Sequence, residues 1–229
     1  MQFFFSRHAL ANIPDNLKDK YIENLNKIKY LSTREEFGVD LINDLTGRKA
    51  ELVLDPVFLL DKNQWLSLCS KSNAREKYVF AYTNRSGQWE EFLQKTSYPM
   101  NNKRVYKISR HLTPKDFISK QVNVSYSISP VEFIETIANA ELVVSASFHC
   151  IAMSIILNIP FVAVLTGNRG KDERVLNILK IAGLEDRILT SNITTEDVSF
   201  PIDYQLVEER ISKYIASSKS FLKQAIFSN

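Results

Sequence analysis

The apolar run from Leu142 to Leu165 restricts the fold more than any other part of the chain. The run is about as long as a membrane-spanning helix, but His149, Asn158 and Pro160 interrupt it. Its two ends are rich in β-branched residues, and its middle is rich in residues that favour helices. We therefore predict a strand, a buried helix and a second strand. Strands that are apolar on both faces are typical of a parallel sheet that helices cover on both sides.

The remaining sequence repeats this alternation of short apolar segments and helical patterns. The strand candidates are residues 2–5, 28–32, 51–54, 78–82, 104–108, 142–145 and 161–165. Strands that alternate with helices along a chain predict an α/β protein. We expect a Rossmann-like parallel sheet flanked by helices.

Signals at helix ends support this division. The segment Ser129 to Glu132 has the serine, proline and glutamate of a capping box, and Thr113 to Asp116 is a weaker version. Gly183, followed by Leu184, is typical of a helix that ends in a left-handed turn. A last helix begins near Asp203 and is expected to dock on the body through one side, which carries Val207, Ile211, Tyr214, Phe221 and Leu222.

Composition and charge exclude several classes of protein. Of the 229 residues, 45% are hydrophobic and 24% are charged, as in a compact protein with a sizeable core. The net charge of +3 is too small to indicate a nucleic-acid surface, and no run of lysine or arginine occurs. We therefore expect no nucleic-acid partner.

The cysteines and the first residues bear on where the protein works. Cys69 and Cys150 are the only cysteines, which disfavours a disulfide framework and a multi-thiolate metal site. The segment Met1 to His8 lacks the basic start, apolar core and cleavage site of a signal peptide. We predict a cytoplasmic protein without a transmembrane segment.

The common catalytic motifs are absent from the sequence. It has no glycine-rich fingerprint for dinucleotides, no phosphate-binding P-loop and no H-E-x-x-H. Its three histidines, His8, His111 and His149, are scattered, so we expect no metal site. Ser145 and Ser147 lie near His149, but no G-x-S-x-G elbow surrounds them, which disfavours serine hydrolysis.

His149 is the strongest candidate for a functional side chain, because it follows a buried strand at the first turn of a predicted helix. Ligands of open α/β sheets bind beyond the carboxyl ends of the strands, and helix starts there offer free N–H groups to anions. We therefore place Ser147 and Phe148, at this helix start, among the substrate-binding residues. An ordinary packing role for the histidine stays open.

Cationic residues follow two other predicted strands. Arg34 follows residues 28–32, and Arg169, Lys171 and Arg174 follow residues 161–165. If these strand ends converge, their side chains provide fixed positive charge for a carboxylate or a phosphate. The alternative is that they form surface ion pairs with the acidic residues beside them, which are Glu35, Glu36, Asp172 and Glu173.

Together, these segments resemble the polysaccharide pyruvyl transferase family. The resemblance rests on residues 31–38, 53–60, 129–134, 147–149, Arg174 and 184–187, in matching order and spacing. It implies a two-domain fold like that of the GT-B glycosyltransferases. It also implies transfer of a pyruvyl group from phosphoenolpyruvate to sugar hydroxyls as a ketal, without a metal or other cofactor.

The resemblance assigns roles to the candidate residues. His149 is expected to be the catalytic acid or base, since an imidazole exchanges protons near neutral pH. Arg34 and Arg174 are expected to bind the donor's carboxylate and phosphate. Glu132 is a second candidate proton carrier, although its capping-box position favours a structural role. Asp55, which precedes a proline, is interpreted as part of the turn between domains.

The chain also departs from the family pattern. Ala146 replaces an acid and Cys150 replaces a glycine beside His149, so an orienting carboxylate is missing and ligand approach is restricted. Relatives carry a substantial region before the strand that starts here at Gln2. We therefore expect a GT-B-like carboxyl-terminal domain with a remnant of the amino-terminal domain.

The expected organisation has three parts. Residues 1–55 are the remnant of the amino-terminal α/β domain, 56–202 the Rossmann-like domain and 203–229 the last amphipathic helix. An incomplete first domain would expose apolar surface and strand edges, which favours a homodimer. Two other functions stay open, namely a sugar-modifying transferase with a nucleotide-sugar donor and a non-catalytic ligand-binding half.

Overall fold

The computed structural model describes residues 13–69, 77–83, 87–100, 103–109, 121–125 and 127–228, apart from the side chains of residues 109 and 169–171. In chain order its elements are α2 (Asp15–Asn26), β1 (Ser32–Thr33), α3 (Glu36–Thr46), β2 (Glu51–Leu52), the 3-10 helix η1 (Pro56–Leu59), α4 (Lys62–Leu66), β3 (Tyr78–Thr83), α5 (Gln88–Thr96), β4 (Arg104–Ser109), β5 (Val122–Ser125), α7 (Pro130–Asn139), β6 (Ala140–Ser145), α8 (Phe148–Leu157), β7 (Phe161–Ala163), α9 (Arg169–Ala182), the 3-10 helix η2 (Glu185–Arg187), α10 (Thr195–Ser199) and α11 (Tyr204–Phe227).

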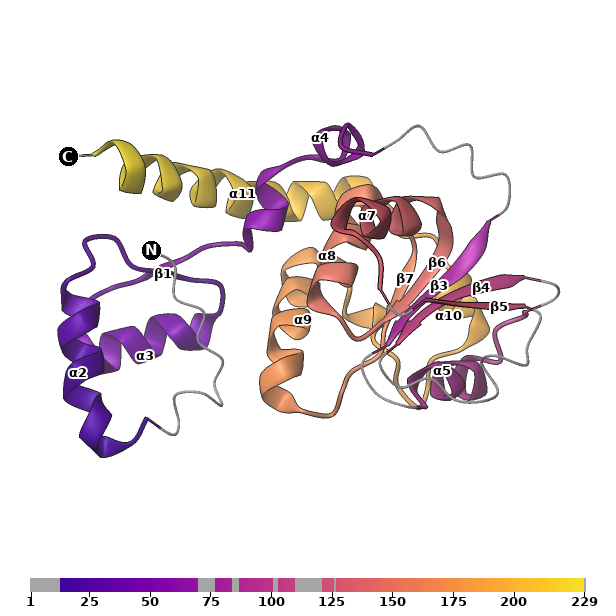
Figure 1. Cartoon of the computed structure of the whole chain (residues 1–229), viewed down its shortest axis with the longest axis horizontal. Helices are drawn as coiled ribbons and strands as arrows, with labels where there is room; N and C mark the ends of the chain where they lie inside the picture. Colours follow the sequence, from indigo (N-terminus) through magenta and orange to yellow (C-terminus); the bar gives the residue numbers. More distant parts are fainter. Residues whose placement is uncertain are drawn as a thin grey trace.

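The main sheet has five parallel strands in the order β5-β4-β3-β6-β7. Its helices lie on both faces (Figure 1), so the predicted α/β class with a parallel sheet flanked by helices is confirmed. The chain runs outward from β3 to β5 on one side, then returns to β6 beside β3 and continues to β7 on the other. The topology therefore switches direction between β3 and β6, which is where open α/β sheets bind ligands.

Each face of the sheet packs against its own group of helices, because side chains along a strand alternate between the faces. Phe80 and Val143 pack with α7, α8, α9 and α11, and this cluster includes Ile134, Ile151, Leu179 and Ile211. Val79 and Val144 face the other way, where Trp89 and Phe92 of α5 and Val198 of α10 cover them. The apolar run that defined the prediction is thus buried on both sides.

Most of the predicted strands are present within one or two residues, but two errors are instructive. Residues 28–31 are not a strand. The Arg48 guanidinium donates hydrogen bonds to the carbonyls of Leu25 and Ile28 at 2.7 and 2.6 Å, in place of a neighbouring strand. The edge strand β5 went unpredicted, since it lacks a continuous apolar run and none of its residues is fully buried. The candidate strand at residues 2–5 lies outside the described residues.

The predicted helix ends are confirmed where they can be seen. Ser129 and Glu132 form the capping box of α7, with reciprocal hydrogen bonds of 3.2 and 2.7 Å. Gly183 has a φ of 68°, and Leu184 N–H donates to the Leu179 carbonyl at 2.9 Å, which closes α9. The weaker signal at residues 113–116 lies outside the described residues.

A small lobe, residues 13–54, stands beside the main sheet (Figure 1). Its strands β1 and β2 pair in parallel, and α3 connects them, with a core of its own. Helix α11 extends from the main body along this lobe, where the Leu54 N–H donates to Ser218 Oγ at 2.9 Å. Val207 and Ile211 are buried as expected, but Leu222 is 44% exposed, which contradicts its predicted docking. The division into domains at residues 55 and 202 stays a prediction.

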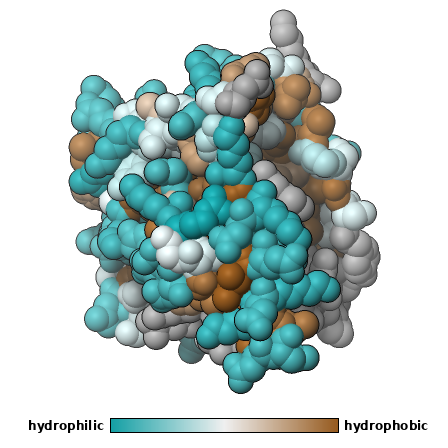
Figure 2. All heavy atoms as spheres, turned by 90° about the vertical axis from the view of Figure 1, so that its left-hand side faces the viewer, coloured by the Kyte–Doolittle hydropathy of each residue, from teal (hydrophilic) through white to brown (hydrophobic). Residues whose placement is uncertain are grey.

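The end of the molecule that carries the small lobe is largely hydrophilic, with separate apolar patches (Figure 2). The exposed apolar side chains include Ile226 and Phe227 at the end of α11. Over the part of the chain that the structure describes, no helix has both the length and the apolarity to cross a membrane.

Candidate active site

His149 lies at the start of α8, immediately beyond the carboxyl end of β6. Ser147 is the N-cap, and its side chain makes no capping hydrogen bond. The backbone here is held by Ser145, whose hydroxyl donates to the Tyr82 carbonyl of β3 at 2.8 Å and accepts from the Ser147 N–H at 3.0 Å. The His149 side chain is 58% exposed, so it is available to a ligand rather than sealed in the core.

Two arginines from distant parts of the chain converge on His149. Arg34, after β1, forms a buried ion pair with Asp55, after β2. The same Asp55 carboxylate lies 3.9 Å from His149 Nε2. Arg174, in α9, lies 3.9 Å from the Glu35 carboxylate. The small lobe and the large lobe, residues 61–199, therefore both contribute side chains to one cluster.

Phe148 connects the parts of this cluster through its ring. The Arg174 guanidinium lies 5.7 Å from the centre of the Phe148 ring, within the range of a cation–π contact. The ring also meets the His149 imidazole edge to face at 5.3 Å. Asn177 adds a hydrogen bond of 3.4 Å to the backbone carbonyl of Arg34. These contacts limit how far the guanidinium and the imidazole can move apart.

The electrostatics of the cluster favour a neutral imidazole. Partial burial, then the positive charges of Arg174 and Arg34, hold the pKa of His149 below its usual value. Burial also lowers the pKa of Arg34 to about 10, with Arg174 contributing. Burial raises the pKa of Glu35 despite the arginines beside it. Its Oε2 is buried and has no hydrogen-bond partner among the described residues.

Arg34 and Arg174 face Asp55 and Glu35, and Glu173 adds a further negative charge near Glu35. The hollow lined by these arginines and Asp55 has a volume of only about 20 Å³. An anion of several atoms can therefore enter only if the guanidinium groups exchange a carboxylate partner for the ligand. Such an exchange is possible because arginine binds carboxylate and phosphate with the same fork of donors.

A larger hollow of about 490 Å³ includes His149 in its lining. It sits beyond the ends of β3 and β4 and the start of α8, and its lining includes Tyr82, Thr83, Ile108, Ser147 and His149. The imidazole thus lines this hollow and also lies near the compact cluster of arginines and carboxylates.

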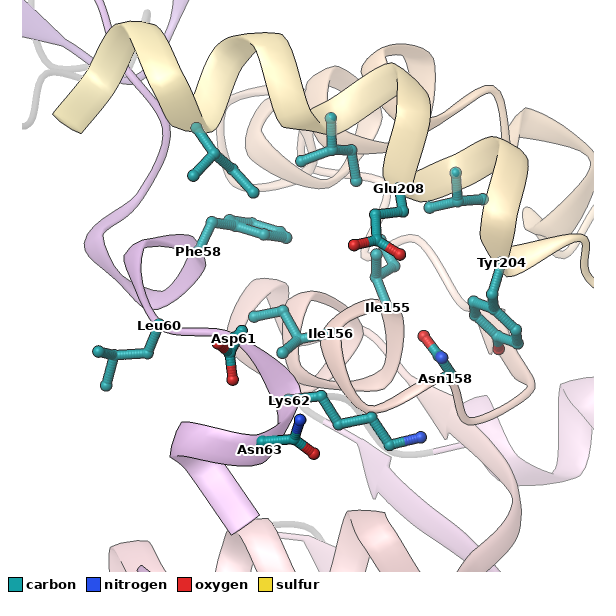
Figure 3. A pocket seen from close by; sticks show the side chains of 13 residues that line it. Phe58, Leu60, Asp61, Lys62, Asn63, Ile155, Ile156, Asn158, Tyr204 and Glu208 are labelled. Carbon is teal, nitrogen blue, oxygen red and sulfur yellow. The ribbon is translucent and has the colours of Figure 1, made fainter. Parts of the chain in front are cut away.

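A third hollow, of about 390 Å³, lies between η1, α4, the end of α8 and α11 (Figure 3). Its walls are mainly apolar, with Asp61, Lys62, Asn158 and Glu208 at the edge. Asp61 caps α4, and Asn158 ends α8 in the left-handed conformation, so both have structural roles. None of the candidate catalytic or substrate-binding residues predicted from the sequence lines this hollow.

The structure brings together four of the predicted residues: His149, Phe148, Arg34 and Arg174. Ser147 lines the larger hollow. Arg169 and Lys171 lie in the first turn of α9, but their side chains are outside the described part. Their predicted roles in binding, like the catalytic role of His149, stay predictions.

Two other predictions about side chains can be compared with the geometry. Glu132 is exposed and bound to the N-cap of α7, in line with the structural alternative. The side chain of Cys150 is fully buried in the core, so it does not face a ligand at the helix start as expected. Burial raises the pKa of this thiol to about 12, which makes it unreactive.

Two carboxylates of the cluster were missed in the sequence. Asp55 was interpreted as a turn residue; it does cap η1 by accepting from the Val57 N–H at 3.1 Å, but it also joins Arg34 to His149. Glu35 was considered only as a surface partner, yet its side chain is 8% exposed. Their positions in the sequence could have indicated a place in the site, because each acid follows a predicted strand of the small lobe, as Arg34 does.

No group of three or more potential metal ligands occurs among the residues that the structure describes. The two guanidinium groups near His149 are suited to binding an organic anion, and the imidazole is suited to moving a proton.

Comparison with known proteins gives a family match. The model of the polysaccharide pyruvyl transferase family matches residues 10–168. No curated protein matches the chain.

Similar solved structures include two glycosyltransferases and an epimerase. The UDP-N-acetylglucosamine 2-epimerase of Rickettsia bellii is 16% identical, with a TM-score of 0.46, and the match covers 100% of this chain and 69% of that one. The glycosyltransferase SnogD of Streptomyces nogalater is 10% identical, with a TM-score of 0.41 and coverage of 76% and 44%. The glycotransferase of kitacinnamycin is 15% identical, with a TM-score of 0.42 and coverage of 67% and 42%. The chain therefore spans less than half of either glycosyltransferase.

Proposed function

This chain belongs to the polysaccharide pyruvyl transferase family, and on that basis we propose that it transfers a pyruvyl group from phosphoenolpyruvate to two hydroxyls of a sugar. The family is a transferase family that acts on polysaccharides. The donor, the sugar and the activity of this chain are our proposals. The observation that carries them is the convergence of Arg34, Arg174 and His149 from both lobes.

The donor's charges fit the two guanidinium groups. Phosphoenolpyruvate has a carboxylate and a phosphate on the same carbon, so it needs two cationic groups that face the same space. Arg34 and Arg174 are close enough for each to affect the pKa of His149, and both already bind carboxylates. The donor replaces Asp55 and Glu35 as their partner. The N–H groups at the start of α8 add further donors to either anion.

The reaction requires two hydroxyls and one proton carrier. The first hydroxyl adds to the central carbon of phosphoenolpyruvate, and a proton is added to the methylene carbon, which becomes a methyl group. The second hydroxyl then displaces phosphate from the central carbon, and its proton leaves with the phosphate. The product is a cyclic ketal, and no oxidant or reductant is consumed.

His149 is the proton carrier in this proposal. Its pKa is lowered in the empty site, so the imidazole is neutral at neutral pH and accepts the proton of the attacking hydroxyl. A bound dianion stabilises the resulting imidazolium, which then donates to the methylene carbon. Asp55, 3.9 Å from Nε2, orients the ring during this exchange.

Thermal unfolding with candidate donors tests the proposal. Phosphoenolpyruvate should raise the melting temperature, since a ligand at 100 times its Kd stabilises by about 2.7 kcal/mol. Arg174→Ala should remove this rise, whereas Arg104→Ala, an exposed arginine at the start of β4, should keep it. A rise with a nucleotide sugar instead would favour a glycosyl-type transferase. No rise with either would favour a non-catalytic half.

The setting of this activity is also proposed. We propose a cytoplasmic enzyme, since Cys69 and Cys150 are both free thiols. Phosphoenolpyruvate and a polysaccharide precursor are its proposed partners. We also retain the homodimer, to which the exposed Ile226 and Phe227 at the end of α11 are suited. A monomer in gel filtration at all concentrations would contradict it.

A further inference from the structure

We propose that the 490 Å³ hollow beside His149 binds the acceptor as a neutral pyranose ring, held against Trp65, Tyr82 and Phe133. This inference rests on the proposed function, because it names the site and chemistry of the second substrate.

The hollow has the position expected of a substrate site. It lies at the carboxyl ends of β3 and β4 and beside the start of α8, so it is at the point where the strand order reverses. Crevices at such points are the usual ligand sites of open α/β sheets. Its volume is within the range typical of small-molecule sites, about 300–1,000 Å³.

The walls are suited to a sugar, whose ring has apolar C–H faces and hydroxyl edges. Aromatic rings from three elements supply the faces, namely Trp65 of α4, Tyr82 of β3 and Phe133 of α7. Hydroxyl groups of Thr83, Ser127 and Ser147 are also in the lining. Such aromatic surface with a few polar groups is typical of ligand sites that fix orientation.

The aromatic walls are held in place before any ligand arrives. The Trp65 Nε1–H donates to the Val57 carbonyl at 3.0 Å, which fixes the indole. Tyr82 meets Phe133 edge to face at 5.4 Å and lies over Phe80 at 6.1 Å. Because these rings are already ordered, binding costs little side-chain entropy.

The charge of the lining favours a neutral ligand. Among the described residues, the lining contains no Asp, Glu, Lys or Arg, and His149 is its only side chain that can become charged near neutral pH. Arg34 and Arg174 do not line this hollow; they line the small hollow beside Asp55. The described lining residues offer a nucleotide diphosphate no lysine or arginine partner, whereas an uncharged sugar needs none.

In this proposal the two substrates bind at different places that His149 connects. His149 is in the lining of the larger hollow, and through Asp55 it contacts the arginine cluster. A hydroxyl of a sugar in the larger hollow can therefore reach the imidazole while the arginine cluster holds the donor. This arrangement lets one proton carrier serve both substrates.

Tryptophan fluorescence tests the proposal directly. The chain has two tryptophans, and Trp89 lies on the opposite face of the sheet, so Trp89→Phe leaves Trp65 as the single reporter. At least one of the methyl glucoside, galactoside and mannoside should change its emission in a saturable way. Tyr82→Ala should weaken this binding about tenfold or more, while Tyr82→Phe, which keeps the ring, should bind as before.

Controls separate this site from the donor site. Arg174→Ala should leave pyranoside binding unchanged while it removes the thermal effect of phosphoenolpyruvate. Tyr98→Ala, a partly buried tyrosine on the other face of the sheet, should not alter pyranoside binding. Pyranoside binding without any phosphoenolpyruvate effect would contradict the proposed function and leave the sugar site standing.

Either of two results would overturn the proposal. The first is that none of the pyranosides changes Trp65 emission up to about 100 mM; if uridine diphosphate does change it, the hollow is assigned to a nucleotide. The second is that the Tyr82→Ala variant binds the pyranosides as tightly as the parent protein does.

Discussion

His149 couples anion binding to protonation. Its pKa is lowered in the empty site by burial and by the two arginines, and an anion bound beside it raises that pKa. Binding therefore takes up a proton, so affinity increases as pH falls through the raised pKa of the complex and levels off below the pKa of the empty site. Glu35 acts in the same direction, because its protonation releases Arg174.

We expect sulfate, which does not titrate in this range, to bind more tightly at pH values below the ordinary histidine range. Isothermal titration at several pH values measures this change. His149→Gln should flatten the profile to the part that Glu35 contributes. A profile that is unchanged in His149→Gln would show that the histidine does not sense the anion.

Asp55 has a large effect on stability, because it is the partner of a buried guanidinium. The side chains of Arg34 and Asp55 are 11% and 6% exposed. Asp55→Asn keeps an oxygen for the Val57 N–H but removes the charge opposite Arg34. We expect the free energy of unfolding to fall by about 3–5 kcal/mol in urea. Asp61→Asn, at the exposed N-cap of α4, is the matched control and should cost far less.

At the level of secondary structure, the end of α9 is sensitive to a single methyl group. Gly183 has a φ of 68°, and a Cβ there would collide with the Arg210 guanidinium, which donates to the Ala182 carbonyl at 3.1 Å. Gly183→Ala should therefore destabilise by about 1–3 kcal/mol in urea. In the Arg210→Ala background the cost should be smaller, since only the backbone strain remains. Equal costs in both backgrounds would exclude the collision.

The elements that sequence predicts well are those set by local signals. The capping box at Ser129 and the glycine at 183 depend on residues a few positions apart, so the sequence contains the whole cause. The strand predicted at residues 28–31 is absent for a reason distant in sequence, because Arg48 donates hydrogen bonds to the carbonyls of Ile28 and Lys29. The strand β5 depends on its neighbour β4 rather than on its own apolar pattern.

The same distinction applies to the site. The strand-end rule accounts for His149 and Arg174, which follow the main-sheet strands β6 and β7, but Arg34 follows β1 of the separate two-stranded sheet. It does not predict which acid pairs with which arginine, because that depends on how the two lobes meet. Asp55 and Glu35 could therefore be placed in the cluster only from the structure.

At the level of the whole molecule, helix α11 connects the two lobes. The Leu54 N–H has Ser218 Oγ as its partner, although the two residues are 164 positions apart. Ser218→Ala leaves this buried N–H without an acceptor, which should cost about 1–3 kcal/mol. Hydrogen exchange of the Leu54 amide should become faster. Ser212→Ala, on an exposed part of α11, should leave that exchange rate unchanged.

The ion pair between Glu35 and Arg174 joins the small lobe to the large one in the empty state. A donor bound by Arg34 and Arg174 together breaks this ion pair but puts a bridge through its own two anionic groups in its place. Occupancy should therefore keep the small lobe attached, and a protease should cut that lobe no faster when the donor is present.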